Sequence, residues 1–445
     1  MKKSVQLLAV GAALWGTWAA PPVAAQARAL PARDVKAIYQ QLLPRIEQIR
    51  LFDNHSHPGF PDDPDVDAMA SPPGSQALRT RADNPELIAA ARALFQYPYR
   101  DSAPGHSEWL VKKKAQLRRS LGAGYFNSIL DKLNIETVVA NRVAMPDYLD
   151  SKRFLWAFFA DSFLFPFDNS AIRSRNADEA VYLPLQEKLL QREMREGGIA
   201  ALPETFDEYL TFVSSVLMKD KQAGAVAMKF EAAYFRSLYF ADPPAGEAAA
   251  VYARYRLKGV PSAAEYTLFQ DCVFRFLLRE AGRLHLSAHF HTAVGVGDFF
   301  SLRDGNVRNL ENVLRDPRYD DVNFVLIHGG YPYDREAIWL AARKNVYIDS
   351  SLTDLYLYPS EFKDVLKHWL SIFPEKVLFG TDAFPFNEAL GAEEAYWLSV
   401  NSTREALAGA LAELIAEGAF TEAQALHIAR GYLHDNAAAL YGRGK

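Results

Sequence analysis

Eight short apolar runs of β-forming residues recur along the chain, and most of the segments between them are long enough to form helices. The runs are residues 49–55, 135–143, 159–167, 223–234, 283–293, 322–330, 345–351 and 376–383. Apolar runs that alternate with helical segments indicate parallel strands that are covered on both faces. Eight such units predict an α/β fold of the (β/α)8 TIM barrel type.

Ionisable residues stand at the carboxyl ends of these predicted strands. They are His55, His57, Arg142, Lys229, His291, His328, Asp349 and Asp382. Because a barrel gathers the carboxyl ends of its strands on one face, we expect these side chains to converge there. An open doubly wound sheet is the main alternative, but no G-x-G-x-x-G motif follows the first run.

Two segments, residues 58–134 and 168–222, are longer than ordinary barrel loops and carry helical patterns. Each follows the carboxyl end of a predicted strand, so we expect both to form helical insertions that cap the barrel mouth. The chain has 445 residues, 49% of them hydrophobic, which is enough for a large packed core. We therefore assign residues 28–445 to one barrel domain.

The first 27 residues have the pattern of a cleaved signal peptide. Lys2 and Lys3 precede an apolar run over residues 5–20, and small residues at 23–27 offer a cleavage site. An uncleaved anchor is the alternative, although the run is shorter than the roughly 20 residues that a spanning helix needs. The pattern predicts a periplasmic or secreted bacterial protein with no membrane association after cleavage.

Charge and cysteine content exclude several kinds of partner and site. The 54 acidic and 49 basic residues give a net charge of −5, so the chain has no basic surplus with which to bind nucleic acid. One cysteine, Cys272, allows neither an internal disulfide nor a cysteine-rich metal cluster. Any metal must therefore be held by nitrogen and oxygen ligands.

The stretch DNHSH at residues 53–57 is a candidate metal-binding motif. In a strand, His55 and His57 project to the same side while Asn54 and Ser56 face the other way. Two imidazoles on one face can chelate a cation. His291 and Asp382, each at another strand end, would complete a set of nitrogen and oxygen ligands for a divalent ion with an open position.

DNHSH, HFHT, IHGGYP and FGTDA, in this order, resemble the amidohydrolase superfamily of metal-dependent TIM-barrel hydrolases, and specifically its amidohydrolase-related group. Residues 295–316 and 322–351 are most similar to the domain that precedes a glutamine-synthetase-like domain in fungal developmental and plant nodulin proteins. The second domain has no counterpart here. The resemblance covers nearly the whole mature chain.

This resemblance implies roles for individual residues. His55, His57, His291 and Asp382 would be metal ligands, and Asp382 would also take a proton from the water that the metal activates. His328 would bond that water or bind a second ion. His289, two residues below His291 on the same strand face, is either an alternative ligand or a residue that supports one.

Lys229, Tyr234, Arg236 and Arg142 are the candidate substrate-binding residues. Several superfamily members carry a carboxylated lysine at the position of Lys229 that bridges two metals, whereas the group resembled here usually binds one. We favour one metal, with Lys229, Tyr234 and Arg236 facing the substrate. Arg142 would hold a substrate carboxylate, with a structural ion pair as the alternative.

These residues predict an enzyme that cleaves an amide, ester or lactone bond in a small, anionic substrate with a metal-activated water. Zn²⁺ is the expected ion, and Mn²⁺ or Fe²⁺ would suit the same ligands. A metal-dependent non-oxidative decarboxylase is the first alternative, because members of the same group use the same ligands. A non-catalytic barrel protein is the second. Whether the chain forms a homo-oligomer is left open by the sequence.

Overall fold

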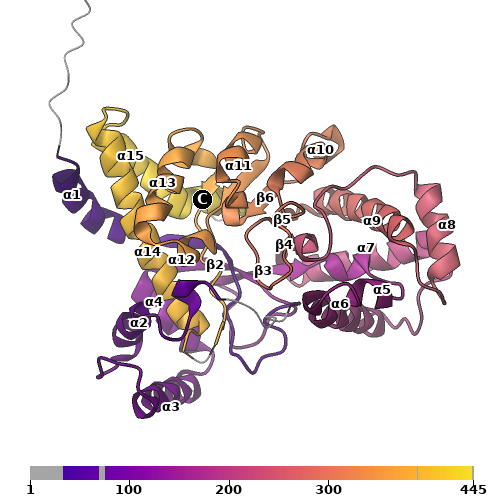
Figure 1. The fold of residues 1–445 in the computed structure, drawn as a ribbon, viewed down its shortest axis with the longest axis horizontal. Coiled ribbons are helices and arrows are strands. Elements are labelled where there is room, and N and C mark those ends of the chain that lie inside the picture. Colours follow the sequence, from indigo (N-terminus) through magenta and orange to yellow (C-terminus); the bar gives the residue numbers. More distant parts are fainter. Residues whose placement is uncertain (1–33, 70–75, 388, 443–445) are drawn as a thin grey trace, which may run out of the picture.

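Eight parallel strands in sequential order form the centre of the molecule (Figure 1). The computed structural model describes residues 34–69, 76–387 and 389–442, so the predicted signal peptide lies outside the described residues. The strands are β1 Leu51–Ser56, β2 Ile135–Asn141, β3 Phe154–Phe159, β4 Ala225–Phe230, β5 Ser287–His291, β6 Phe324–Ile327, β7 Val346–Asp349 and β8 Val377–Leu378. Each strand pairs in parallel with the next along the chain.

Backbone hydrogen bonds between β1 and the residues that follow β8 bring the two edge strands together. The amide of Asn54 donates to the carbonyl of Phe379 at 2.8 Å, and the amide of His57 donates to that of Ala383 at 2.8 Å. In the return direction, the amide of Thr381 donates to the carbonyl of His55 at 3.1 Å. The sheet is thus a nearly closed barrel, which confirms the predicted (β/α)8 fold.

Seven predicted strands overlap the observed ones closely, and the third was misplaced. Strand β3 ends at Phe159, the residue at which the predicted run 159–167 begins. Asp161–Leu164 instead form a short 3-10 helix in which Asp161 accepts a hydrogen bond from the amide of Glu231 at 2.6 Å. The aromatic residues beyond that turn pack outside the barrel, where the ring of Phe165 lies 4.9 Å from that of Phe235. Their apolar character therefore reflects burial against helices rather than strand pairing.

Helices surround the barrel and extend over it (Figure 1). They are α1 Val35–Glu47, α2 Glu86–Phe95, α3 Pro104–Leu121, α4 Gly124–Leu133, α5 Ser170–Arg173, α6 Ala177–Glu196, α7 Phe206–Gln222, α8 Ala245–Tyr255, α9 Ala263–Leu284, α10 Glu311–Leu314, α11 Asp334–Leu340, α12 Thr353–Tyr356, α13 Pro359–Leu370, α14 Ala392–Ala416, α15 Glu422–Arg430 and α16 Asn436–Leu440. The first predicted insertion contains α2 to α4 and the second contains α5 to α7. Throughout the described part of the chain, every helix is too short or too polar to cross a bilayer.

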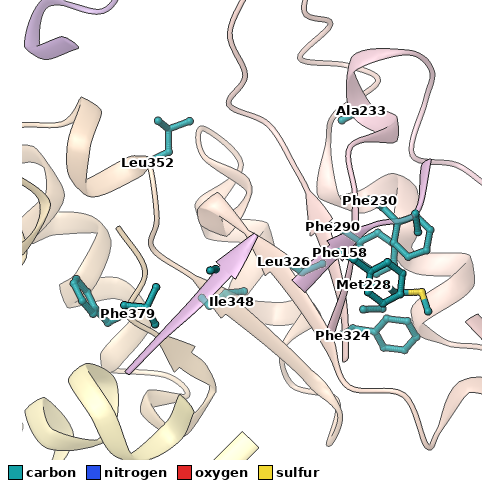
Figure 2. Packing of buried hydrophobic residues seen from close by; sticks show 14 of the residues in the cluster. Phe158, Met228, Phe230, Ala233, Phe290, Phe324, Leu326, Ile348, Leu352 and Phe379 are labelled. Carbon is teal, nitrogen blue, oxygen red and sulfur yellow. The ribbon is translucent and has the colours of Figure 1, made fainter. Parts of the chain in front are cut away.

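Apolar strand residues pack in two separate clusters. Phe158, Met228, Phe230, Phe290 and Phe324 point outward from their strands into the layer beneath the helices (Figure 2). Burying one such side chain contributes about 1.5–3 kcal/mol. A smaller cluster fills the lower part of the barrel interior; it comprises Phe52, Val139, Leu155, Ala157, Ala227, Val325, Ile327, Leu378, Ala437 and Ala438. Side chains alternate along a strand, so the residues next to the outward-facing Phe230 and Phe290 face inward. These inward-facing residues are Lys229, His289 and His291, and they lie above the smaller apolar cluster.

Candidate metal centre

The pairing register of β1 shifts between Asp53 and Ser56, which changes the direction of its side chains. Asn54 was expected to face away from the histidines, but its side chain lies inside the barrel, where Nδ2 donates to Asp349 Oδ2 at 2.7 Å. Ser56 does face outward and contacts the hydroxyl of Tyr396 at 2.8 Å. The irregularity therefore lets Asn54, His55 and His57 all point inward, and the strict alternation used to predict the motif was wrong at Asn54.

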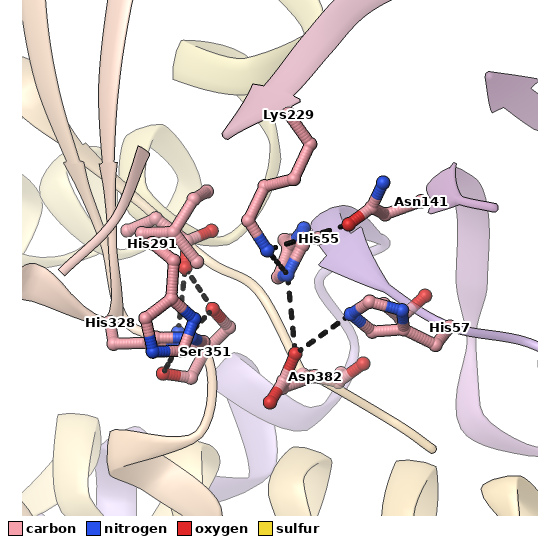
Figure 3. A network of polar contacts seen from close by, with 12 residues as sticks. His55, His57, Asn141, Lys229, His291, His328, Ser351 and Asp382 are labelled. Atoms are coloured by element: carbon pink, nitrogen blue, oxygen red, sulfur yellow. Dashed lines mark hydrogen bonds and ion pairs between the residues drawn. The ribbon is translucent and has the colours of Figure 1, made fainter. Parts of the chain in front are cut away.

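His55, His57 and Asp382 converge at the carboxyl end of the barrel (Figure 3). Asp382 Oδ1 lies 3.2 Å from His55 Nε2 and 3.4 Å from His57 Nε2. The amide of Asp382 donates to the carbonyl of His55 at 2.8 Å, and its backbone has φ +51°, a left-handed conformation that aspartate tolerates better than most residues. The strand-closing hydrogen bonds thus fix the carboxylate beside the two imidazoles.

His328 and His291 form the other side of the cluster. One ligand atom from each of His55, His328 and Asp382 lies within 4.8 Å of the other two, close enough for a shared cation. His328 Nδ1 lies 2.9 Å from the carbonyl oxygen of Ser351, which can only accept, so Nδ1 carries the proton and Nε2 presents its lone pair. His328 Nε2 is 3.1 Å from His291 Nδ1, which donates to it. His291 Nε2 is buried and has no partner among the described residues.

The charge states of these groups suit a divalent metal. Burial lowers the pKa values of His55, His291 and His328, that of His328 to about 4, so the imidazoles are neutral near neutral pH. Burial alone would raise the pKa of Asp382, but His328 together with the hydrogen bonds from His55 and His57 holds it well below its usual range. Neutral imidazoles around one carboxylate are a ligand set for zinc and similar ions. The residues present therefore fit a metal.

A cavity of about 60 Å³ opens beside this cluster. It is lined by His57, Asp67, Met69, Tyr182, Lys229, Glu231, Tyr234, His291, Val296, His328, Leu352, Asp382, Phe384 and Phe386. The lining includes residues from both predicted insertions, namely Asp67 and Met69 from the first and Tyr182 from the second. The insertions thus help to enclose the site.

Comparison with known proteins places the chain in a family. Residues 205–443, more than half of the chain, match the family model described as amidohydrolase. The chain belongs to the amidohydrolase family. A stretch of 153 residues is also 31% identical to protein fluG of Emericella nidulans, and it covers 34% of this amidohydrolase and 17% of the fungal protein. The chain therefore spans only a small part of that relative.

Solved structures share the barrel at low sequence identity. A protein from Lactobacillus casei described as a metal-dependent hydrolase superposes with a TM-score of 0.58 at 18% identity, with 90% of this amidohydrolase and 97% of that chain covered. Uronate isomerase of Thermotoga maritima gives a TM-score of 0.60 at 12% identity, with 91% and 97% covered. These likenesses show the fold alone.

Two arginines predicted to bind substrate do not reach the cavity of the amidohydrolase. The guanidinium of Arg142 is fully buried and bonds Asp63 Oδ2 at 2.6 Å, so the structural ion pair is the arrangement observed. Arg236 bonds Asp271 Oδ1 on α9 at 2.6 Å. Each arginine is neutralised by a carboxylate from a segment distant in sequence. The expectation of an anionic substrate depended on three basic residues, and two of them are therefore not available to bind it.

Lys229 and Tyr234 do line the cavity, and Lys229 reaches the histidine cluster. Its Nζ lies 3.4 Å from His55 Nε2 and 3.4 Å from Asn141 Oδ1 (Figure 3). The same nitrogen lies 3.5 Å from Glu231 Oε1. His289 lies deeper in the barrel, where Nε2 contacts the hydroxyl of Tyr441 at 2.7 Å.

Three residues that line the cavity were missed as site residues. Asp67 Oδ2 lies 3.3 Å from His57 Nδ1, and the acidic run at residues 62–67 directly after the histidine motif was a usable signal for it. Glu231 was considered only as a partner of Lys229. Nothing in the sequence marked Tyr182, which lies in the first half of α6 and lines the cavity because this helix packs over the barrel.

Proposed function

We propose that this amidohydrolase is a metal-dependent hydrolase that cleaves an amide, ester or lactone bond of a small molecule. The observation that carries the proposal is the position of the Asp382 carboxylate, which lies within 3.4 Å of both His55 Nε2 and His57 Nε2 in the wall of a cavity. His55, His57 and Asp382 would hold one divalent ion, for which we favour Zn²⁺, with His328 or His291 as a further ligand. The ion would act as a Lewis acid and lower the pKa of a nearby water.

Asp382 has the properties of the proton-transferring group. Because its pKa is depressed, the carboxylate is ionised near neutral pH and can accept a proton from the attacking water. The same carboxyl can return that proton to the leaving nitrogen or oxygen as the scissile bond breaks. His328 carries its proton on Nδ1, where Ser351 accepts it, so Nε2 could accept from that water only in place of His291 Nδ1, which donates to it in this structure.

The cavity also favours a small and partly apolar substrate. Phe384 and Phe386, with ring centroids 5.4 Å apart, line it beside His57. Aromatic walls exclude water and strengthen the electrostatic interactions of the carboxylate and imidazoles within the site.

Metal analysis of the purified chain, combined with a screen of acyl amides, esters, lactones and aromatic acids, tests the proposal. We expect about one equivalent of metal and hydrolysis that the Asp382→Asn variant lowers by at least about 10²-fold. Asp364→Asn, which alters an exposed carboxylate on α13, serves as the matched control and should leave hydrolysis unchanged. Release of carbon dioxide from an aromatic acid without incorporation of water would instead identify a decarboxylase.

We further propose that the enzyme acts outside the cytoplasm, on the basis of Lys2, Lys3 and the apolar run that follows them. N-terminal sequencing of the protein from a periplasmic fraction is expected to begin after residue 25 or 27. Retention of Met1 in a soluble cytoplasmic fraction would refute this.

A further inference from the structure

Asp67, Tyr182 and Glu231 give the cavity a polar region beside the histidine cluster, which Asp67 touches at His57 Nδ1. They come from the segment after β1, from α6 and from the end of β4, respectively, and all three line the cavity. None of them belongs to the group of residues close enough to share a metal with Asp382. These three side chains can therefore bind a part of the substrate other than the bond that is cleaved.

Two buried polar atoms in this region have no hydrogen-bonding partner among the described residues. They are the hydroxyl of Tyr182, a residue that is 1% exposed, and Oε2 of Glu231, which is 4% exposed. The other carboxylate oxygen of Glu231 lies 3.5 Å from Lys229 Nζ. A buried polar atom without a partner is costly, so such a hydroxyl and such a carboxylate oxygen on two residues that line a cavity indicate a ligand that donates hydrogen bonds.

The lining of the cavity holds more acidic than basic side chains. Apart from Asp382, the lining holds the carboxyl groups of Asp67 and Glu231, and Lys229 is the only lysine or arginine among the described residues that form it. In the described part of the chain, the one group of side chains close enough to hold a metal is His55, His328 and Asp382, so a second ion has no ready-made site at Asp67 and Glu231.

Aromatic rings line the cavity together with these carboxyl groups. The rings of Tyr182 and Tyr234 meet edge to face with centroids 5.4 Å apart, and both line the cavity. Tyrosine faces attract cations through their quadrupole, and the attraction grows when water is excluded. A carboxylate, a phenolic hydroxyl and aromatic faces together are the chemistry that recognises an organic ammonium group.

We propose that Glu231 and Tyr182 bind the ammonium group of an amino-bearing substrate, with Asp67 as a further carboxyl group in the same cavity wall. The assignment deepens the proposed hydrolase function, because it places an amine on the molecule whose amide or ester bond is cleaved. It is opposite in sign to the anionic substrate that the sequence predicted, since Arg142 and Arg236 are engaged elsewhere.

Alaninamide and isobutyramide form a matched pair of probes, because a methyl group replaces the ammonium group in a molecule of nearly the same shape. Binding to the full-length, zinc-loaded protein is measured by calorimetry at about pH 6.5, where the α-amino group is protonated. We expect alaninamide to bind at least about tenfold more tightly than isobutyramide, the usual size of one charge-assisted contact. Tyr182→Phe and Glu231→Gln should each reduce that ratio and leave isobutyramide binding unchanged.

Tyr182→Phe is the sharper variant, because it removes a hydroxyl that has no partner among the described residues and does not alter the histidine cluster. The variant also distinguishes two ways of binding the amine. If the metal coordinated the amine, the loss of the Tyr182 hydroxyl would leave the binding ratio unchanged. Equal binding of the two probes by the wild-type protein would overturn the proposal, as would a ratio unchanged in both variants. Two equivalents of bound metal would also overturn it, because a second cation would then satisfy Glu231.

Turnover is measured separately, as ammonia released from alaninamide. A preference for alaninamide without ammonia release would support the ammonium site and leave the proposed hydrolysis of this amide unsupported. Hydrolysis of amides with no such preference would support the hydrolase and exclude the ammonium site.

Discussion

Tyr441 connects the irregular strand β1 to the floor of the candidate site, and its hydroxyl can be removed without changing its packing. The hydroxyl donates to Asn54 Oδ1 at 2.7 Å, and it accepts from His289 Nε2 at 2.7 Å. The ring stacks on Phe52 with centroids 5.8 Å apart and planes 10° from parallel. Tyr441→Phe keeps this stacking and leaves one buried acceptor and one buried donor without a partner.

The expected loss of unfolding free energy in Tyr441→Phe follows from these two hydrogen bonds. An unpaired buried polar group costs about 1–3 kcal/mol, so the two together set a range of about 2–6 kcal/mol. Because the neighbouring side chains can relax, we expect the free energy of unfolding to fall by about 3 kcal/mol. With an m-value of about 3 kcal/mol/M, the urea midpoint would fall by about 1 M.

Urea denaturation followed by tryptophan fluorescence and circular dichroism measures this change. Tyr239→Phe is the matched control, since Tyr239 is 54% exposed, and it should change the midpoint very little. A loss below about 0.5 kcal/mol in Tyr441→Phe would refute the reasoning, because it would mean that Asn54 and His289 find other partners. The inward placement of Asn54 would then be in doubt as well.

Three further predictions concern other parts of the molecule. Burial raises the pKa of Asp220 to about 7, so the folded state keeps this proton where the unfolded chain has lost it, and the protein loses stability as pH rises from about 4 to about 7. Asp220→Asn should flatten this pH dependence and raise the free energy of unfolding above pH 7 by about 1–3 kcal/mol. Denaturation at several pH values measures both effects. A Cβ on Gly380 would press against Asp349 Oδ2, so Gly380→Ala should lower the melting temperature by the equivalent of about 1–3 kcal/mol, whereas Gly246→Ala, with open space around it, should not. Zinc at about 100 times its Kd should stabilise the metal-free protein by about 2.7 kcal/mol, as thermal denaturation would show. This gain should vanish in His57→Asn but persist in His427→Asn, which alters an exposed histidine on α15. An equal gain in both variants would place the metal elsewhere.

The sequence by itself determined the barrel and the residues at its mouth. Strand formation depends on local apolar runs, and the parallel arrangement follows from the helices between them, so seven strands could be located from composition and spacing. The placement of His55, His57, His291, His328 and Asp382 at one face followed directly, because all parallel strands of a barrel end on the same side. The third strand was misplaced because Phe163 and Phe165 are as apolar as strand residues but pack against helices.

Only the tertiary structure decided which charged residues remain available inside the site. Arg142 and Arg236 looked like substrate ligands until Asp63 and Asp271, each from another segment, were found to neutralise them. The shift in β1 that turns Asn54 inward depends on hydrogen bonds to residues after β8, which no local pattern records. Contacts between distant segments set the electrostatics of a buried site, because in a medium of low polarity a single opposing charge changes what a side chain can bind. The same contacts left Oε2 of Glu231 and the hydroxyl of Tyr182, two groups that the sequence did not mark, without a hydrogen-bonding partner among the described residues.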